Sequence, residues 1–140
     1  MNLSLRTPSD KEFEQICNYI TEFELDNRDL QKKQFTAAFR NNQLVGFGRL
    51  REHLDCTELC SLGVVTPLRR KGIGKAIATE LIKRAAQDIH LVCIIPDFFK
   101  AFGFQVIKEY PSSIQNKIGY CTQELIVPDT YVAMLLKKFL

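Results

Sequence analysis

Hydrophobic and polar positions alternate along the chain in patterns that predict both helices and strands. Ser9 and Glu12 have the spacing of a capping box, and between Phe13 and Phe23 hydrophobic residues recur every three or four positions. This pattern is typical of an amphipathic helix. A nearly continuous hydrophobic run at 89–95 indicates a strand in the interior of a sheet.

Turn residues divide the rest of the chain into short elements. Asn41 and Asn42 tolerate positive φ and predict a hairpin, while Pro96 opens a short helix that Gly103 ends, with Phe104 folding back. We expect strands at 1–6, 35–40, 44–54, 57–65, 105–110 and 131–139, a helix at 71–88, a partly helical segment at 111–124, and a loop or short helix at 26–33. This order predicts an α/β (α+β) fold with one mixed central sheet, as a single domain over residues 1–140. The last strand either pairs with a second chain or is internal.

Composition excludes several classes of protein. The chain has 140 residues, 46% hydrophobic and 25% charged, which are ordinary values for a soluble globular domain. No hydrophobic run is long enough to cross a membrane, and the first residues do not resemble a signal peptide. Five scattered cysteines favour reduced thiols and a cytoplasmic protein. A net charge of +3 is too small to indicate a nucleic-acid partner.

The segment that carries chemistry is a strand, a tight loop and a helix at 58–75. Gly72 and Gly74 let a ligand approach the backbone, and free N–H groups at a helix start favour phosphate. The spacing fits neither a P-loop nor a dinucleotide fingerprint, because Ala76 follows Lys75 and position 77 is Ile. Cations crowd the helix start, against the helix dipole, as expected if an anion binds there: Arg69, Arg70, Lys71 and Lys75.

Arg69, Gly72 and Gly74 form an Arg-x-x-Gly-x-Gly motif, and with the aromatic helix ending at 98–104 the chain resembles the GNAT superfamily of N-acetyltransferases. The resemblance implies an enzyme with the GNAT fold, in which the fourth and fifth strands (57–65 and 89–95) splay apart to admit acetyl-CoA as co-substrate. It implies no metal. The other interpretation is an ordinary strand-to-helix turn with a solvated basic cluster. By the resemblance, the coenzyme-binding residues are Leu62, Gly63, Val64, Arg69, Arg70, Lys71, Gly72, Ile73, Gly74 and Lys75.

Glu58 is the candidate catalytic base. Some GNAT enzymes have a catalytic glutamate at the matching position, and even spacing along a regular strand puts Glu58 on the face of Val64. Such a carboxylate removes the ammonium proton directly or through water. The alternative is a solvated or ion-paired glutamate. Phe99 stands where many relatives have a tyrosine that protonates the leaving thiolate, and Tyr120 is a possible substitute for it.

Cys60 as a nucleophile and a metal site at His53, Cys56 and Cys60 are both disfavoured. No histidine is placed to activate the cysteine, and the spacing matches no zinc pattern.

The acceptor is the least defined part of the prediction. The segment at 111–122 is faintly similar to that of N-acetylglutamate synthase-type acetyltransferases, which implies a small amine bearing a carboxylate. Arg49 and Lys117 are the candidate carboxylate-binding residues, the alternative being solvated surface cations. We expect acetyl transfer to a small-molecule amine by direct attack in a ternary complex, in a monomer or homodimer without nucleic-acid or membrane partners. The alternatives are a catalytically weak acyl-CoA sensor and a protein or peptide N-acetyltransferase.

Overall fold

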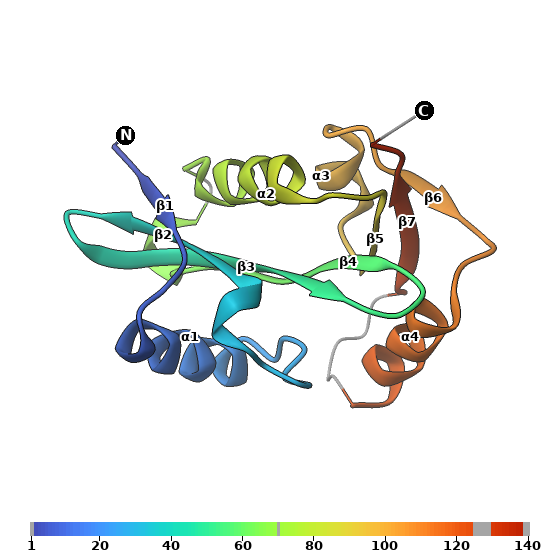
Figure 1. Ribbon diagram of the computed structural model, residues 1–140, viewed down its shortest axis with the longest axis horizontal. Coiled ribbons are helices and arrows are strands. Elements are labelled where there is room, and N and C mark those ends of the chain that lie inside the picture. The colour runs from blue at the N-terminus through green and yellow to red at the C-terminus, as the bar shows by residue number, and fades with distance from the viewer. Residues whose placement is uncertain (1, 70, 125–129, 139–140) are drawn as a thin grey trace. The chain divides into compact units, whose positions relative to one another are not determined.

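The computed structural model describes residues 2–69, 71–124 (the last without its side chain) and 130–138. Within these residues, seven strands form a mixed sheet in the order β1-β2-β3-β4-β5-β7-β6, with four α-helices (Figure 1). The strands are β1 (Ser4–Arg6), β2 (Phe35–Arg40), β3 (Gln43–Glu52), β4 (Thr57–Val64), β5 (Ile89–Cys93), β6 (Gln105–Ile107) and β7 (Val132–Leu136). The helices are α1 (Asp10–Glu22), α2 (Ile73–Arg84), α3 (Pro96–Lys100) and α4 (Ser112–Glu124), with 3₁₀ turns at Lys32–Gln34 and Thr66–Leu68. The predicted α/β class and mixed sheet are therefore confirmed.

Internal contacts group the chain into two compact units, each built from two stretches of sequence. The first comprises Met1–Leu50 and Ser61–Arg84, and the second comprises Arg51–Cys60 and Ala85–Leu140. The chain therefore changes unit within β3 and again within β4, and neither unit is one continuous segment.

In the first unit, the antiparallel strands β1, β2 and β3 lie between α1 and α2 (Figure 1). Ser9 and Glu12 form the predicted capping box, with the Ser9 N–H donating to Glu12 Oε1 at 2.8 Å and the Glu12 N–H to Ser9 Oγ at 3.2 Å. Asn41 and Asn42 form the hairpin turn with φ of 52° and 62°. The buried face of α1 packs on the sheet through Ile16 and Ile20, with Phe35, Ala37, Phe39 and Phe47 on the strands.

In the second unit, β5 pairs with β4 in parallel and with β7 antiparallel. The described ladder between β4 and β5 consists of Thr57↔Ile89 and Glu58↔His90, although β5 continues to Cys93. This short ladder is the one expected of two strands that part. β7 lies between β5 and β6, so the last strand is internal to the sheet.

Several predicted element boundaries were wrong. Of the two alternatives for residues 26–33, a loop or a short helix, the loop is correct, and the 3₁₀ turn Lys32–Gln34 lies at its end. The helix predicted at 71–88 spans Ile73–Arg84, because Gly72 has φ of +84° and precedes its first turn. The strand predicted at 105–110 ends at Ile107, and the one at 131–139 is described as Val132–Leu136. The partly helical segment is a full helix, Ser112–Glu124.

The other predicted elements agree with the structure apart from a few terminal residues. The Gly103 helix ending is present as expected: Gly103 has φ of +103°, and the Phe104 N–H donates to the Phe99 carbonyl at 3.3 Å.

Candidate active site

Glu58 of β4 is a fully buried carboxylate, and side-chain nitrogens of two described residues lie against its oxygens. His53 Nε2 lies 2.8 Å from Glu58 Oε1, and Lys117 Nζ lies 3.0 Å from Glu58 Oε2. Glu58 has no exposed surface, and the side chain of Lys117 is only 5% exposed. The solvated alternative for Glu58 is therefore wrong, whereas its ion-paired alternative describes the side chain accurately.

Local structure explains why these three side chains meet. Asp55, in the turn between β3 and β4, accepts a hydrogen bond at Oδ2 from the Ser113 N–H at 3.1 Å and so caps the first turn of α4. Ile114 of α4 packs in a cluster with Cys56 and Ala133. These contacts fix α4 against the sheet, and Lys117, one helical turn beyond Ile114, reaches Glu58.

The turn that carries His53 is fixed by backbone contacts. The His53 N–H donates to the Cys56 carbonyl at 2.8 Å, which closes the turn between β3 and β4. Thr57 Oγ1 donates to Glu52 Oε2 at 2.8 Å beside it. These two hydrogen bonds hold the short turn that places His53 beside Glu58. In the sequence, His53 was considered only as a metal ligand and was disfavoured by its spacing. Its position five residues before Glu58, at the start of a predicted strand, was the signal that could have indicated the His53–Glu58 pair.

The predicted anion loop lies in the first unit, and Arg70 lies outside the described residues. Gly72 has φ of +84°, and a Cβ built there would meet no atom within 4 Å, so the backbone is open to solvent at this point. Lys71 and Lys75 are exposed beside it, while Ile73 is buried in the core. The loop therefore presents a glycine backbone and two solvent-facing ammonium groups at the start of α2.

Arg69 is engaged with its own unit. Its Nε donates to the Val64 carbonyl at 3.0 Å, and its guanidinium carbon lies 4.7 Å from the centre of the Phe23 ring. Arg69 therefore joins the end of β4 to the end of α1. Through this bond, Arg69 positions Val64, and both are predicted coenzyme-binding residues.

β4 is bent at Ser61, which has φ of +52° within the strand. Ser61 Oγ donates to the Asp26 carbonyl at 2.9 Å, which holds this conformation. A residue in the left-handed region interrupts the two-residue alternation of a strand. The spacing argument that put Glu58 and Val64 on one face assumed a regular strand, and that premise does not hold across Ser61.

The predicted coenzyme-binding residues Leu62, Gly63 and Val64 follow this bend. A Cβ at Gly63 would lie 2.6 Å from the Phe47 ring, so glycine permits close packing here. Leu62 and Val64 are partly exposed.

Arg49 of β3 is fully buried, which overturns the interpretation of a solvated surface cation. Its Nε donates to Gln34 Oε1 at 2.8 Å, and its Nη2 donates to the carbonyls of Arg28 and Asp29. Arg49 thus braces the loop between α1 and β2. Its Nη1 is buried and has no hydrogen-bond partner among the described residues.

Other candidate groups are packing residues in the structure. Phe99 is 5% exposed and packs against Phe98 and Phe104. Burial raises the pKa of the Cys56 thiol to about 12. Cys60 is also buried, and none of the five cysteines, all of them among the described residues, forms a disulfide. Burial lowers the pKa of His90, which lies beside Glu58 in the sheet register.

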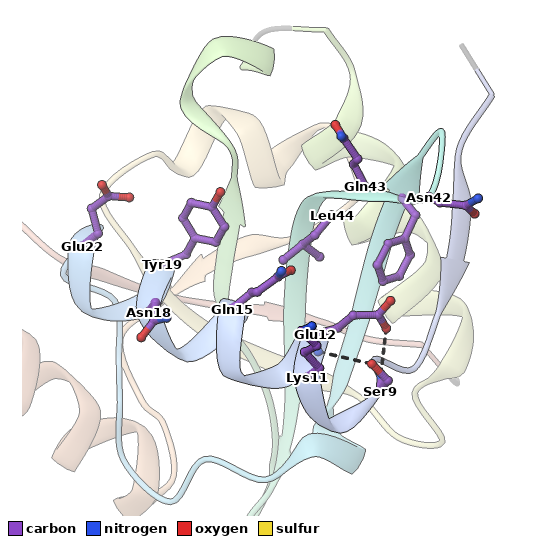
Figure 2. Close-up of a pocket in the computed structure, with 11 residues that line it drawn as sticks. Ser9, Lys11, Glu12, Gln15, Asn18, Tyr19, Glu22, Asn42, Gln43 and Leu44 are labelled. Atoms are coloured by element: carbon purple, nitrogen blue, oxygen red, sulfur yellow. Dashed lines mark hydrogen bonds between the residues drawn. The ribbon is translucent and has the colours of Figure 1, made fainter.

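A large open groove lies elsewhere, between α1 and the β2–β3 hairpin (Figure 2). Its volume is about 830 Å³, and its walls include Gln15 and Tyr19 of α1 and Gln43 and Leu44 of the hairpin. None of the residues predicted for the coenzyme, the acceptor or catalysis lines it. Within the described residues, no group of three or more His, Cys, Asp or Glu side chains is arranged to hold a metal, and no helix is both long and apolar enough to span a bilayer.

Solved structures with the same fold include proteins in complex with coenzyme A or with an analogue that contains it. N-acetylglutamate synthase from Neisseria gonorrhoeae, complexed with coenzyme A and N-acetyl-glutamate, matches 100% of this chain and 36% of its own, with TM-score 0.76 and 14% identity. The match to Rv2747 from Mycobacterium tuberculosis, in complex with CoA and NLQ, covers 97% of this chain and 99% of that one, with TM-score 0.77 and 18% identity. The match to Arabidopsis thaliana Naa50, in complex with the bisubstrate analogue CoA-Ac-MVNAL, covers 98% of this chain and 99% of that one, with TM-score 0.67 and 20% identity.

The chain spans about a third of the length of the N-acetylglutamate synthase chains that it matches. No curated protein matches it by sequence. The acetyltransferase (GNAT) family model matches residues 2–104, which contain the predicted anion loop, Glu58 and the Gly103 helix ending. The chain therefore belongs to the GNAT family of acetyltransferases.

Proposed function

We propose that this acetyltransferase moves an acetyl group from acetyl-CoA to the primary amine of a small molecule that carries a carboxylate, such as an amino acid. The amine attacks the thioester directly in a ternary complex. Acetyl-CoA is the co-substrate of the family. The choice of a small carboxylate-bearing acceptor is the finer proposal, and it rests on one side chain.

The observation that carries the proposal is the buried guanidinium of Arg49. Its Nε and Nη2 are bonded to the loop between α1 and β2, whereas Nη1 has no partner among the described residues. A buried donor without an acceptor costs about 1–3 kcal/mol, and more when it is charged. A bound carboxylate would satisfy this nitrogen, and the loop bonds already hold the guanidinium in one orientation. Because Arg49 is fully buried, a carboxylate reaches it only when the residues that cover it move aside. In this proposal Lys117 has a different task, since its ammonium pairs with Glu58.

The coenzyme would occupy the surface that the sequence motif defines. The exposed backbone at Gly72 and the N–H groups at the start of α2 suit a pyrophosphate, with Lys71 and Lys75 as countercharges. The backbone at Leu62, Gly63 and Val64 would bind the pantetheine arm as an added strand does. We expect Arg69 to position this segment through its bond to the Val64 carbonyl.

Glu58 is the group on which removal of the ammonium proton depends. An amine attacks a thioester only as the free base, so the ammonium must lose a proton first. Glu58 has no exposed surface, and each of its oxygens already lies within 3.0 Å of a side-chain nitrogen. Glu58 therefore promotes deprotonation of the ammonium through a second group that lies between them, and does not itself contact solvent.

The proposal is tested by measuring CoA release with a panel of amines. The panel pairs each amino acid with its carboxamide and with its decarboxylated amine, and adds short peptides. We expect the amino acid to exceed its carboxamide by about 10- to 100-fold in kcat/KM, because one charge-assisted hydrogen bond contributes about 1.5–3 kcal/mol. Equal rates for acid and carboxamide would refute the carboxylate site. Preference for peptides would favour the protein N-acetyltransferase alternative.

Two controls separate the remaining alternatives. A thermal-shift titration with acetyl-CoA, run beside NAD, reports coenzyme binding without any acceptor. Binding without turnover on any amine would indicate the acyl-CoA sensor. Arg49→Lys keeps a cation but loses the planar fork, so we expect it to reduce the preference for acid over carboxamide while coenzyme binding is unchanged.

A further inference from the structure

His53 is the more exposed of the two side chains whose nitrogens lie against the buried Glu58. Its side chain is 15% exposed, whereas that of Glu58 is not exposed at all. Nε2 of the ring is used by Glu58, and the other ring nitrogen, Nδ1, makes no hydrogen bond with any described residue. Nε2 and Nδ1 lie on opposite sides of the imidazole ring, so with Nε2 facing the buried Glu58 we assign the exposed part of His53 to the Nδ1 side.

Charge around Glu58 decides which ring nitrogen carries the proton. The Lys117 ammonium, 3.0 Å from Oε2, supplies the countercharge that a buried carboxylate requires. An ionised carboxylate only accepts hydrogen bonds, so the Nε2 atom facing it must be the donor. In neutral His53 the lone pair is then on Nδ1, the solvent-reachable nitrogen. The three side chains thus hold one tautomer in place.

We propose that His53 is the catalytic base of this enzyme, with Glu58 as the residue that positions it and Lys117 as the residue that keeps Glu58 charged. The inference rests on the proposed acetyl transfer to an amine. A base whose second nitrogen is bound by a carboxylate is a recurrent arrangement, because the carboxylate orients the ring and stabilises the imidazolium. It resolves how a fully buried Glu58 promotes proton removal.

The proton moves first, and the acyl group follows. His53 Nδ1 takes one proton from the substrate ammonium and becomes imidazolium, and the amine nitrogen bonds to the thioester carbon. The C–S bond breaks as the carbonyl re-forms, and the second nitrogen proton ends on the CoA sulfur. His53 then releases its proton to solvent. The products are the N-acetylamine, CoA thiol and one proton.

Other titratable groups surround this dyad. Glu52 is bonded to Thr57, Asp55 caps α4, and His90 pairs in register with Glu58 on β5. His90 is the chain's other histidine and provides a matched control, because it has no assigned part in the reaction.

The first test compares pH profiles of kcat/KM for the wild type, His53→Gln and His90→Gln with the best acceptor amine. We expect His53→Gln to lower kcat/KM by about 10²- to 10⁴-fold near neutral pH, the usual contribution of a general base. The loss should shrink above the pKa of the amine, where the acceptor is already deprotonated. His90→Gln should stay within about threefold of wild type. A His53→Gln profile parallel to the wild type at all pH values would overturn the proposal, since a merely structural defect does not depend on the protonation of the amine.

The second test does not require turnover. With two histidines in the chain, ¹H–¹⁵N correlation spectra of the imidazole rings assign each tautomer, with His53→Gln identifying the signals. We expect neutral His53 to carry its proton on Nε2. A proton on Nδ1 would refute the inference even in an active enzyme. If no amine is acetylated, the transfer proposal fails, and with it the role of His53 as a base; the tautomer measurement then judges the dyad alone.

Discussion

Removing one charge of the Glu58–Lys117 pair should destabilise the protein strongly, and removing both should not. The two charges lie 3.0 Å apart, with side-chain exposures of 0% for Glu58 and 5% for Lys117. At an effective dielectric constant of about 20, that separation corresponds to an attraction of about 5–6 kcal/mol. Much of this attraction offsets the cost of taking both charges out of water.

Lys117→Met leaves a buried carboxylate without its countercharge, and Glu58→Gln leaves a buried ammonium. We expect each to lower the free energy of unfolding by about 3–5 kcal/mol at pH 7. The double variant has no buried charge at this position, and the amide oxygen that Glu58→Gln introduces would still accept a hydrogen bond from His53. It should therefore be more stable than either single variant.

The assay is urea unfolding followed by far-UV circular dichroism, because the chain has no tryptophan. Equal m-values across the four proteins would establish that the midpoints report stability. The reasoning is refuted if the two single losses add to the double loss within about 0.5 kcal/mol, as they do for independent sites. Arg6→Gln, which removes a surface partner of Glu12, is a matched control and should leave the urea midpoint close to that of the wild type.

Three further outcomes are expected. Gly72→Ala should lower stability by about 1–2 kcal/mol in urea unfolding, since the cost of φ +84° is conformational and no atom lies near the new Cβ; no loss would show that this backbone is not fixed. Ser9→Ala should lower the free energy of unfolding by about 1 kcal/mol, because it removes the helix cap. The contacts of Arg6 and Ser9 with Glu12 lower the pKa of its carboxyl from 4.5 to about 2. Because the folded pKa is the lower one, the Glu12 contribution is complete above about pH 4.5 and is lost as pH falls toward 2; Glu12→Gln should flatten that part of an acid titration, and an unchanged slope would contradict it. With its pKa near 12, Cys56 should resist a thiol reagent at pH 8 until urea unfolds the chain, and rapid native labelling, mapped by mass spectrometry, would refute its burial.

Features encoded by neighbouring residues could be predicted from the sequence. The capping box at Ser9, the Asn41–Asn42 turn and the Gly103 helix ending each depend on a few adjacent positions, and the structure contains all three. The Arg-x-x-Gly-x-Gly motif is equally local, and it led to the family. Such features are readable because their backbone requirements are met by particular residue types close together in the chain.

Features that depend on distant residues were missed. α4 is capped by Asp55, which precedes it by more than fifty residues, so its full extent was not visible locally. The same packing brings Lys117 to Glu58 and gives it a partner that the sequence did not suggest. Ser61 shows the opposite failure: a serine carries no signal for positive φ, and here the Asp26 carbonyl holds it there.

The position of β7 has a consequence for how the chain acquires its structure during synthesis. β5 and β6 are made first, yet each pairs with β7, which emerges from the ribosome after them. Until Val132–Leu136 is available, β6 lacks the neighbour that the finished sheet provides, and the hydrophobic edge of β5 is open to incorrect pairing. The second unit is therefore completed late, while the α1 packing with β1–β3 depends on residues already translated. A chain stalled before β7 would be an aggregation-prone species whose first half is already ordered.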